Sequence, residues 1–243
     1  MSKLFDIDSP LIQGLNRIAD LMWLNVLTLV CCIPIITAGP ALTAAHYVAL
    51  KMKRKEEGYI TKEFFKSFKM NFKQSTIIGL LIWIITLIFA TDFYIIQEGG
   101  IALSNVLQVL LMAMGLLFVF TVIWVFPIQA KFINTIKATL KNAFALSIIH
   151  IPKTLLMLVV YLLPYIGLYI TMRVFPLVLL FGISAPIYVS ATLYNKMFKK
   201  LEEGILERIE KEKAAEAGKD IQTDTEEEDT IFSDKPIVGN DKL

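Results

Sequence analysis

Residues 31–73 read CCIPIITAGPALTAAHYVALKMKRKEEGYITKEFFKSFKMNFK, an apolar segment followed directly by a run of lysines and aromatic residues. The apolar part is interrupted at Ile33-Pro34 and again at Gly39-Pro40. Proline removes a backbone N–H donor and clashes with the preceding helical turn, while Gly-Pro suits a helix stop followed by a helix start. We therefore predict a helix break at Pro34, Gly39 and Pro40, between helices at about residues 14–33 and 40–55.

The length of the apolar run around this break supports the same interpretation. Apolar residues continue from Leu21 to Leu50, and a straight helix of about 30 residues would reach roughly 45 Å, well beyond a hydrocarbon core of about 30 Å. Two short helices, the second of them re-entrant or barely crossing, fit this length. The alternative is one bent helix, which would give five membrane spans and an N-terminus outside the cell.

The lysine-rich part of the stretch indicates its side of the membrane. Three acidic residues, Glu56, Glu57 and Glu63, are outnumbered by eight basic ones. The basic residues are Lys51, Lys53, Arg54, Lys55, Lys62, Lys66, Lys69 and Lys73. Short loops with such an excess of positive charge stay in the cytoplasm, so we predict a cytoplasmic loop here.

Within that loop, Thr61 to Lys73 has the pattern of an amphipathic helix. At 100° per residue, four phenylalanines fall within one arc of about 100° and four lysines fall on the other side. Such a helix either lies on anionic lipid or docks a cytoplasmic partner. The predicted partner-docking or lipid-docking face consists of Phe64, Phe65, Phe68, Phe72, Lys62, Lys66, Lys69 and Lys73.

The composition of the whole chain is that of a membrane protein. Of its 243 residues, 56% are hydrophobic and 19% are charged, and its mean hydropathy is +0.61. These values exceed the apolar content of soluble domains. Uncharged stretches and the lysine-rich loops between them predict later spans at Ser75–Ile96, Ile101–Phe126, Thr154–Met172 and Val174–Tyr194. We expect an all-α, polytopic helical bundle of about six membrane helices in the bacterial cell membrane, with both termini cytoplasmic.

The C-terminal region differs in composition from the rest. We place a transmembrane domain at residues 1–200 and a charged cytoplasmic tail at residues 201–243. Beyond about residue 214 the tail consists mainly of Glu, Asp, Lys, Thr and Gly, with an acidic block at Glu226 to Asp229. That composition predicts disorder.

A weak internal sequence similarity occurs at an offset of 72 residues. Phe68, Lys69, Phe72, Ser75 and Ile77 correspond to Leu140, Lys141, Phe144, Ser147 and Ile149. On one interpretation each half of the protein is a cytoplasmic amphipathic helix followed by a membrane hairpin. On the other, two basic juxtamembrane helices are similar by chance.

The sequence contains little that could carry chemistry. His46 and Asp92 are candidate polar residues at membrane depth; His46 suits either an interfacial packing role or a proton relay, and Asp92 lies near a predicted outer turn. The two histidines and the adjacent Cys31 and Cys32 do not make a metal-binding pattern. Without a nucleophile, phosphate-loop or zinc-protease motif, we predict no catalytic, cofactor-binding or metal-binding residue and no enzyme activity.

Several short motifs resemble those of the YesL family, bacterial membrane proteins that carry a domain of unknown function. The similarity covers roughly residues 10 to 200. The motifs are Pro34-Ile-Ile-Thr-Ala-Gly-Pro40, Ala44-Ala45-His46-Tyr47, Glu56-Glu57-Gly58-Tyr59, Phe64-Phe65-Lys66-Ser67-Phe68-Lys69, Asn71-Phe72-Lys73-Gln74 and Lys141-Asn142. The resemblance implies a small polytopic protein, often encoded beside carbohydrate uptake transporters of the ATP-binding-cassette (ABC) type.

Two functional hypotheses follow. The first is an accessory or regulatory subunit linked to carbohydrate ABC-type uptake, whose partners are the lipid bilayer and, as the resemblance implies, transporter subunits; nucleic acid is not expected. The second is an autonomous carrier or channel for a neutral small solute, because the predicted spans hold almost no charge.

Overall fold

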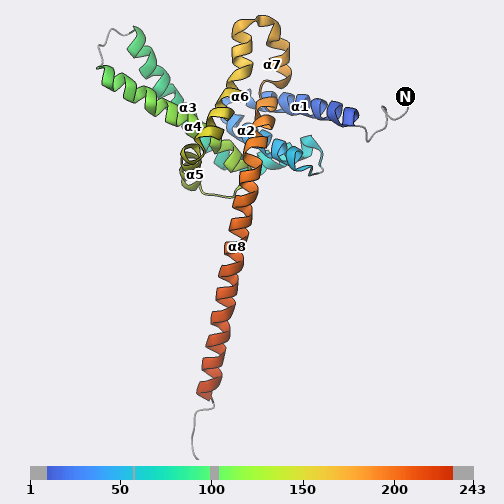
Figure 1. Ribbon diagram of the computed structural model, residues 1–243, viewed down its shortest axis with the longest axis vertical. Coiled ribbons are helices and arrows are strands. Elements are labelled where there is room, and N and C mark those ends of the chain that lie inside the picture. The colour runs from blue at the N-terminus through green and yellow to red at the C-terminus, as the bar shows by residue number, and fades with distance from the viewer. Residues whose placement is uncertain (1–9, 57, 99–103, 232–243) are drawn as a thin grey trace, which may run out of the picture. The chain divides into compact units, whose positions relative to one another are not determined.

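The computed structural model describes residues 10–56, 58–98 and 104–231, and in that part of the chain it contains helices and no strand. The predicted all-α class is therefore confirmed. The elements in order are α1 (Pro10–Cys32), α2 (Ile35–Arg54), α3 (Ile60–Glu98), α4 (Asn105–Lys131), α5 (Ile136–Ile149), α6 (Ile151–Ile170), the short 3₁₀ helix η2 (Met172–Val174), α7 (Phe175–Phe181) and α8 (Ser184–Ile231) (Figure 1).

The chain divides into two compact units, Met1–Asn195 and Lys196–Leu243. The first unit contains α1 to α7 and the beginning of α8. The second contains the rest of α8, whose backbone is helical through Ile231; its runs of Glu, Lys and Ala are good helix formers. The predicted disorder beyond about residue 214 stays a prediction, and residues 232–243 lie outside the described part of the chain.

The first break in the chain lies at Ile33-Pro34, between α1 and α2. Pro34 has an extended conformation with φ −76° and ψ 123°. The hydroxyl of Thr37 lies 2.6 Å from the carbonyl oxygen of Cys31 and 2.9 Å from that of Pro34, so carbonyls at the break gain a partner. The predicted break at Gly39 and Pro40 is corrected, because both residues lie inside α2 and are buried.

The close packing of α2 against α3 explains why Gly39 occurs within a helix. A Cβ atom on Gly39 would collide with the carbonyl oxygen of Ser75. One built on Gly79 would lie 3.2 Å from the Cα of Gly39. Near this crossing the hydroxyls of Thr43 and Ser75 lie 3.0 Å apart. Small residues thus let the two backbones approach, as in many membrane helix pairs.

Among the residues that the structure describes, four helices are long and apolar enough to cross a membrane, or up to five if one bent pair counts as a span. The four segments are Leu11–Cys32, Ile60–Ile96, Asn105–Lys131 and Ile151–Ile170, and the bent pair is Met172–Phe181 with Ser184–Lys211. These helices are consistent with a membrane protein. The predicted number of about six is not confirmed, since α2 is not among them.

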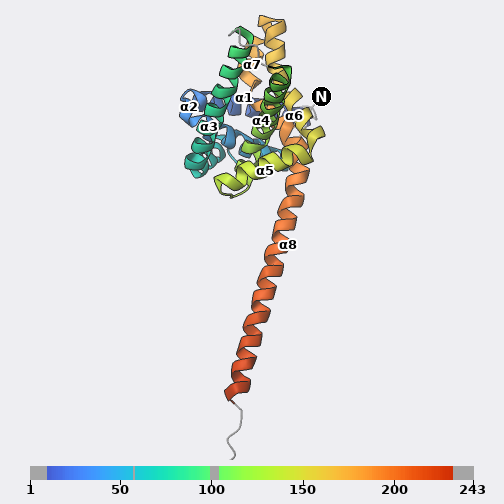
Figure 2. The ribbon, with the colours of Figure 1, turned by 90° about the vertical axis from the view of Figure 1, so that its left-hand side faces the viewer.

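The helix α3 is longer than a membrane crossing requires. Its 39 residues correspond to about 58 Å, roughly twice the thickness of a hydrocarbon core. The sequence predicted an amphipathic helix at residues 61–73 and a separate span from Ser75; the structure joins the two without a break. Figure 2 shows that the α3–α4 and α6–α7 hairpins both rise away from α5.

A single side chain supports the break between α7 and α8. Asn25 of α1 is fully buried. Its Oδ1 accepts hydrogen bonds from the backbone N–H groups of Ile183 at 2.9 Å and Ser184 at 2.8 Å, and its Nδ2 donates to the carbonyl of Leu179 at 2.8 Å. Asn25 therefore satisfies backbone groups that the interrupted helix leaves unpaired.

Candidate functional site

The predicted docking face lies on the first turns of α3, where its four phenylalanines form one continuous cluster. The ring centroids of Phe68 and Phe72 are 5.5 Å apart, and those of Phe64 and Phe68 are 6.2 Å apart. Phe64 is fully buried and Phe68 half-buried, whereas Phe65 and Phe72 are each 39% exposed. The face is therefore anchored in the protein by Phe64, and Phe65 and Phe72 are free to make external contacts.

The cationic side of the same segment is exposed. Lys62, Lys66, Lys69 and Lys73 all lie at the surface. Beside them is an open groove of about 560 Å³, lined by Tyr59, Thr61, Lys62, Phe65, Lys66 and Lys69. The structure thus places exposed aromatic rings and ammonium groups side by side on one end of α3.

Two polar contacts fix this end of α3 to the rest of the first unit. The indole N–H of Trp23 in α1 donates to the hydroxyl of Thr61 at 2.8 Å. The ammonium of Lys51 in α2 lies 3.0 Å from the carboxylate of Glu63, and this hydrogen-bonded pairing raises the pKa of Lys51. The segment is therefore held in place by both α1 and α2.

A second candidate site surrounds His46, which the structure buries among three helices. His46 lies on α2 and is 4% exposed. Its Nδ1 is 3.1 Å from the hydroxyl of Tyr194 on α8, and its Nε2 is 3.4 Å from the hydroxyl of Tyr161 on α6. In a neutral imidazole, both ring nitrogens can use these hydroxyls as partners. One ring nitrogen then donates to a tyrosine and the other accepts from one.

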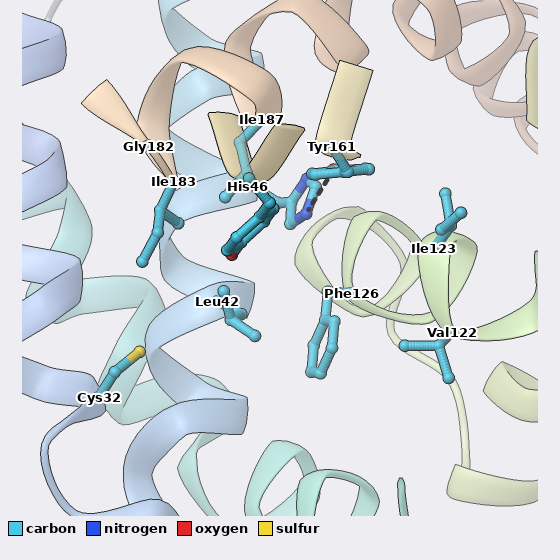
Figure 3. Close-up of a pocket in the computed structure, with 11 residues that line it drawn as sticks. Cys32, Leu42, His46, Val122, Ile123, Phe126, Tyr161, Gly182, Ile183 and Ile187 are labelled. Atoms are coloured by element: carbon cyan, nitrogen blue, oxygen red, sulfur yellow. Dashed lines mark hydrogen bonds between the residues drawn. The ribbon is translucent and has the colours of Figure 1, made fainter. Parts of the chain in front are cut away.

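A cavity of about 370 Å³ opens beside this cluster (Figure 3). It lies between helices that are far apart in the chain, and none of the described residues that line it is charged. Figure 3 shows His46 and Tyr161 together, with Cys32 on the far side of Leu42. The lining comprises Cys32, Leu42, His46, Val122, Ile123, Phe126, Tyr161, Tyr165, Gly182, Ile183 and Ile187.

The other predicted polar residue, Asp92, is not part of this site. It is half-exposed near the end of α3 and borders a shallow depression with Ile84, Leu87, Ile88 and Thr91. The structure therefore does not bring Asp92 and His46 into one site. In the described part of the chain, no group of three or more His, Cys, Asp or Glu residues could hold a metal ion.

The two tyrosines were missed by the sequence analysis. Tyr161 is 115 residues and Tyr194 is 148 residues from His46. The available signal was a tyrosine within an uncharged span, because a hydroxyl at membrane depth requires a hydrogen-bond partner. That signal marks each tyrosine as a candidate but does not identify His46 as the partner.

Comparison with known proteins gives a partial match. Residues 21–93 match the model of a family described as "Protein of unknown function, DUF624". The matched segment includes His46, the Gly39–Gly79 crossing and the whole docking face, but it ends before Tyr161 and Tyr194. No curated protein and no solved structure matches the chain.

Proposed function

We propose that this chain is a multi-pass protein of the bacterial cell membrane that acts as an accessory or regulatory subunit and not as an enzyme. In this proposal the first turns of α3 and the C-terminus are cytoplasmic. The lysine excess around the docking face supports that orientation, because short basic loops stay in the cytoplasm.

The continuity of α3 is the observation that carries the proposal. The first charge-free stretch of this helix begins at Gln74, directly after Lys73, so about 14 residues precede it, or roughly 21 Å of helix. Because they belong to the same helix, these turns cannot lie flat on the bilayer while the rest of α3 crosses it. A projecting segment with exposed Phe65 and Phe72 is better suited to a protein partner than to a lipid surface.

The residues of the docking face indicate which kind of partner surface would complement it. Two partly exposed aromatic rings beside four lysines complement an apolar groove bordered by carboxylates. The resemblance to the YesL family favours a subunit of a carbohydrate ABC transporter as the partner that carries such a groove. Aromatic anchors of this kind dominate the binding energy of many interfaces.

Co-purification tests this proposal directly. The tagged protein is extracted from its own membranes into native nanodiscs, and its partners are quantified by mass spectrometry. We expect the double variant Phe65→Ser with Phe72→Ser to reduce partner recovery at least about tenfold, because each aromatic anchor contributes on the order of 1–2 kcal/mol to binding, and to reduce sugar uptake.

The matched control is Met70→Ser. Met70 is 71% exposed on the same helix and lies outside the docking face, so this variant should recover the partner as wild type does. If the correctly inserted double variant Phe65→Ser with Phe72→Ser shows unchanged partner recovery and unchanged sugar uptake, the docking proposal is wrong. Recovery that depends only on anionic lipid in the nanodisc would favour lipid binding instead.

The cavity beside His46 favours a second candidate function, an autonomous carrier of a neutral small solute. Its lining lacks charged side chains, and transport of an ion would call for a charged or coordinating group at membrane depth. The test is solute flux into liposomes that contain this protein alone. A reproducible absence of flux with folded protein removes this candidate.

A further inference from the structure

We propose that the cavity beside His46 binds a small uncharged molecule with an apolar body and one hydroxyl group. This site is independent of the docking face on α3, and it would exist whether or not that face binds a partner. Binding would be a property of the protein alone.

The walls of the cavity define the body of the ligand. Leu42, Ile123, Phe126 and Ile187 present hydrocarbon surface, and no charged side chain lines the space. A charged ligand would lose its hydration without gaining a compensating partner. An apolar body loses nothing of this kind, and about 370 Å³ lies within the range of small-molecule sites in proteins.

The Tyr161 hydroxyl, held by the imidazole of His46, provides the polar group that orients the ligand. Both residues line the cavity. The distance from His46 Nε2 to the Tyr161 hydroxyl is 3.4 Å, long for a hydrogen bond, whereas the bond to Tyr194 is 3.1 Å. A tyrosine hydroxyl donates one hydrogen bond and accepts two, so the contact with His46 leaves Tyr161 able to bond a ligand oxygen.

The surrounding structure holds the walls in place before any ligand arrives. Tyr194 is fully buried and fixes the far nitrogen of the imidazole. Gly182 and Ile183 line the cavity at the break between α7 and α8, where Asn25 holds the Ile183 N–H at 2.9 Å. A site that is already formed avoids the entropic penalty of ordering loops upon binding.

The two adjacent cysteines supply an internal reporter for the site. Cys32 lines the cavity and Cys31 does not, and both are free thiols. The variants Cys31→Ser and Cys32→Ser each leave one thiol in the chain. In nanodiscs, the rate of thiol modification by methyl methanethiosulfonate is measured with 1-octanol, octane or octanoate, three eight-carbon probes that differ in their polar end.

We expect 1-octanol to slow modification of Cys32 by about fivefold or more, and octane and octanoate to slow it much less. Modification of Cys31 should not respond, so it reports any general effect of the probes on the membrane. Tyr161→Phe should abolish the advantage of octanol over octane. The control Tyr169→Phe, at a residue that is 94% exposed and outside the cavity, should preserve it.

Equal slowing of both thiols, or an octanol effect that survives Tyr161→Phe, would overturn the proposal. If Cys32 does not react with the reagent, the same three probes are compared by the unfolding temperature of the protein. A rise with octanol in wild type that is lost in Tyr161→Phe is then the expected result, and no rise overturns the site. Variants of Phe65 and Phe72 should leave all these values unchanged, which separates this test from that of the docking proposal.

Discussion

The helix α3 and the pair α5–α6 begin from similar sequence and are built differently. Phe68, Lys69 and Ser75 in α3 correspond to Leu140, Lys141 and Ser147 in α5, and both serines are fully buried. Yet α3 continues from Ile60 to Glu98, whereas the chain turns at His150 between α5 and α6. In Figure 2, α5 lies crosswise to the α3–α4 and α6–α7 hairpins, whereas α3 is itself one arm of a hairpin.

A proline distinguishes the two segments. Pro152 is the second residue of α6, and the residue 72 positions earlier is Leu80, inside α3. Proline lacks the N–H that would bond the carbonyl of Ile148, and its ring clashes with that carbonyl in a continuous helix. Leucine has neither effect, so the cationic turns of α3 stay in line with its apolar half.

The break at His150 is stabilised by Thr154, at a position where α3 has isoleucine. The Thr154 hydroxyl lies 3.1 Å from the carbonyl oxygens of Ser147 and His150, and it accepts a hydrogen bond from the Trp124 indole at 2.9 Å. The corresponding residue of α3 is Ile82. Of these two segments, only α3 keeps its basic turns in line with the apolar turns that follow, because the turn at His150 separates α5 from α6.

The largest effect on stability is expected when a proline is placed in α3 at the position that corresponds to Pro152. Leu80→Pro should lower the free energy of unfolding by about 3 kcal/mol or more, because it removes a backbone hydrogen bond and kinks the helix. The measurement is the unfolding midpoint in mixed micelles, with helicity by circular dichroism. Leu80→Ala is the control, since Leu80 is 40% exposed; equal stability of the two variants would contradict a continuous α3.

The second effect concerns the close packing of α2 against α3. Gly39→Ala should destabilise the protein by about 1–3 kcal/mol, because the added methyl group meets the Ser75 carbonyl and overpacks the α2–α3 contact. Gly14→Ala is the matched control within α1, where the described part of the chain places no packing neighbour within 4 Å of the new atom. The unfolding midpoint of this control should stay the same or rise; a similar fall in both variants would argue against the close crossing.

The third effect tests the break at His150. Thr154→Val keeps the side-chain shape but leaves the Trp124 N–H without its acceptor, which should lower the free energy of unfolding by about 1–3 kcal/mol. Thr86→Val in α3 removes an exposed hydroxyl that bonds the Ile82 carbonyl of its own helix, and it should change stability by less than about 0.5 kcal/mol. The comparison fails if both threonines respond alike.

The smallest effect concerns the ion pair at the start of α3. Glu63→Gln removes the charge opposite Lys51, and since both side chains are partly exposed, we expect a loss of about 0.2–1 kcal/mol. The loss should disappear at high salt, where such pairs are screened. A loss that persists in 1 M NaCl would mean that the carboxamide perturbs packing instead.

Local features of the fold were predictable from the sequence because their causes are local. The turn near Pro34 follows from proline chemistry, and the amphipathic face follows from the spacing of Phe64 and Phe68. Gly39-Pro40 was misinterpreted because a glycine that permits close helix packing has the same sequence signature as one that ends a helix. The neighbour that decides between these roles is Ser75, which only the fold brings to Gly39.

The cavity could not be predicted for a related reason. His46 was recognised as a candidate, but its partners come from α6 and α8, and sequence periodicity contains no information about which distant helices meet. The same limit applies to Asn25, whose role depends on backbone groups 154 to 159 residues away. Sequence patterns identify polar residues at membrane depth, but only the packed structure shows which groups form hydrogen bonds with them.

The role of Asn25 has a consequence for how the protein is made. Its amide has no partner until the chain has been synthesised as far as Leu179 to Ser184, a delay of roughly 8–30 s at about 5–20 residues per second. During that time the first helix must carry an unpaired polar group in or near the lipid. The hydrogen bonds of the first helix are therefore completed only when α7 and the start of α8 have been made. Chains truncated before Leu179 should be degraded faster than the full-length chain, and a pulse-chase experiment would measure this difference.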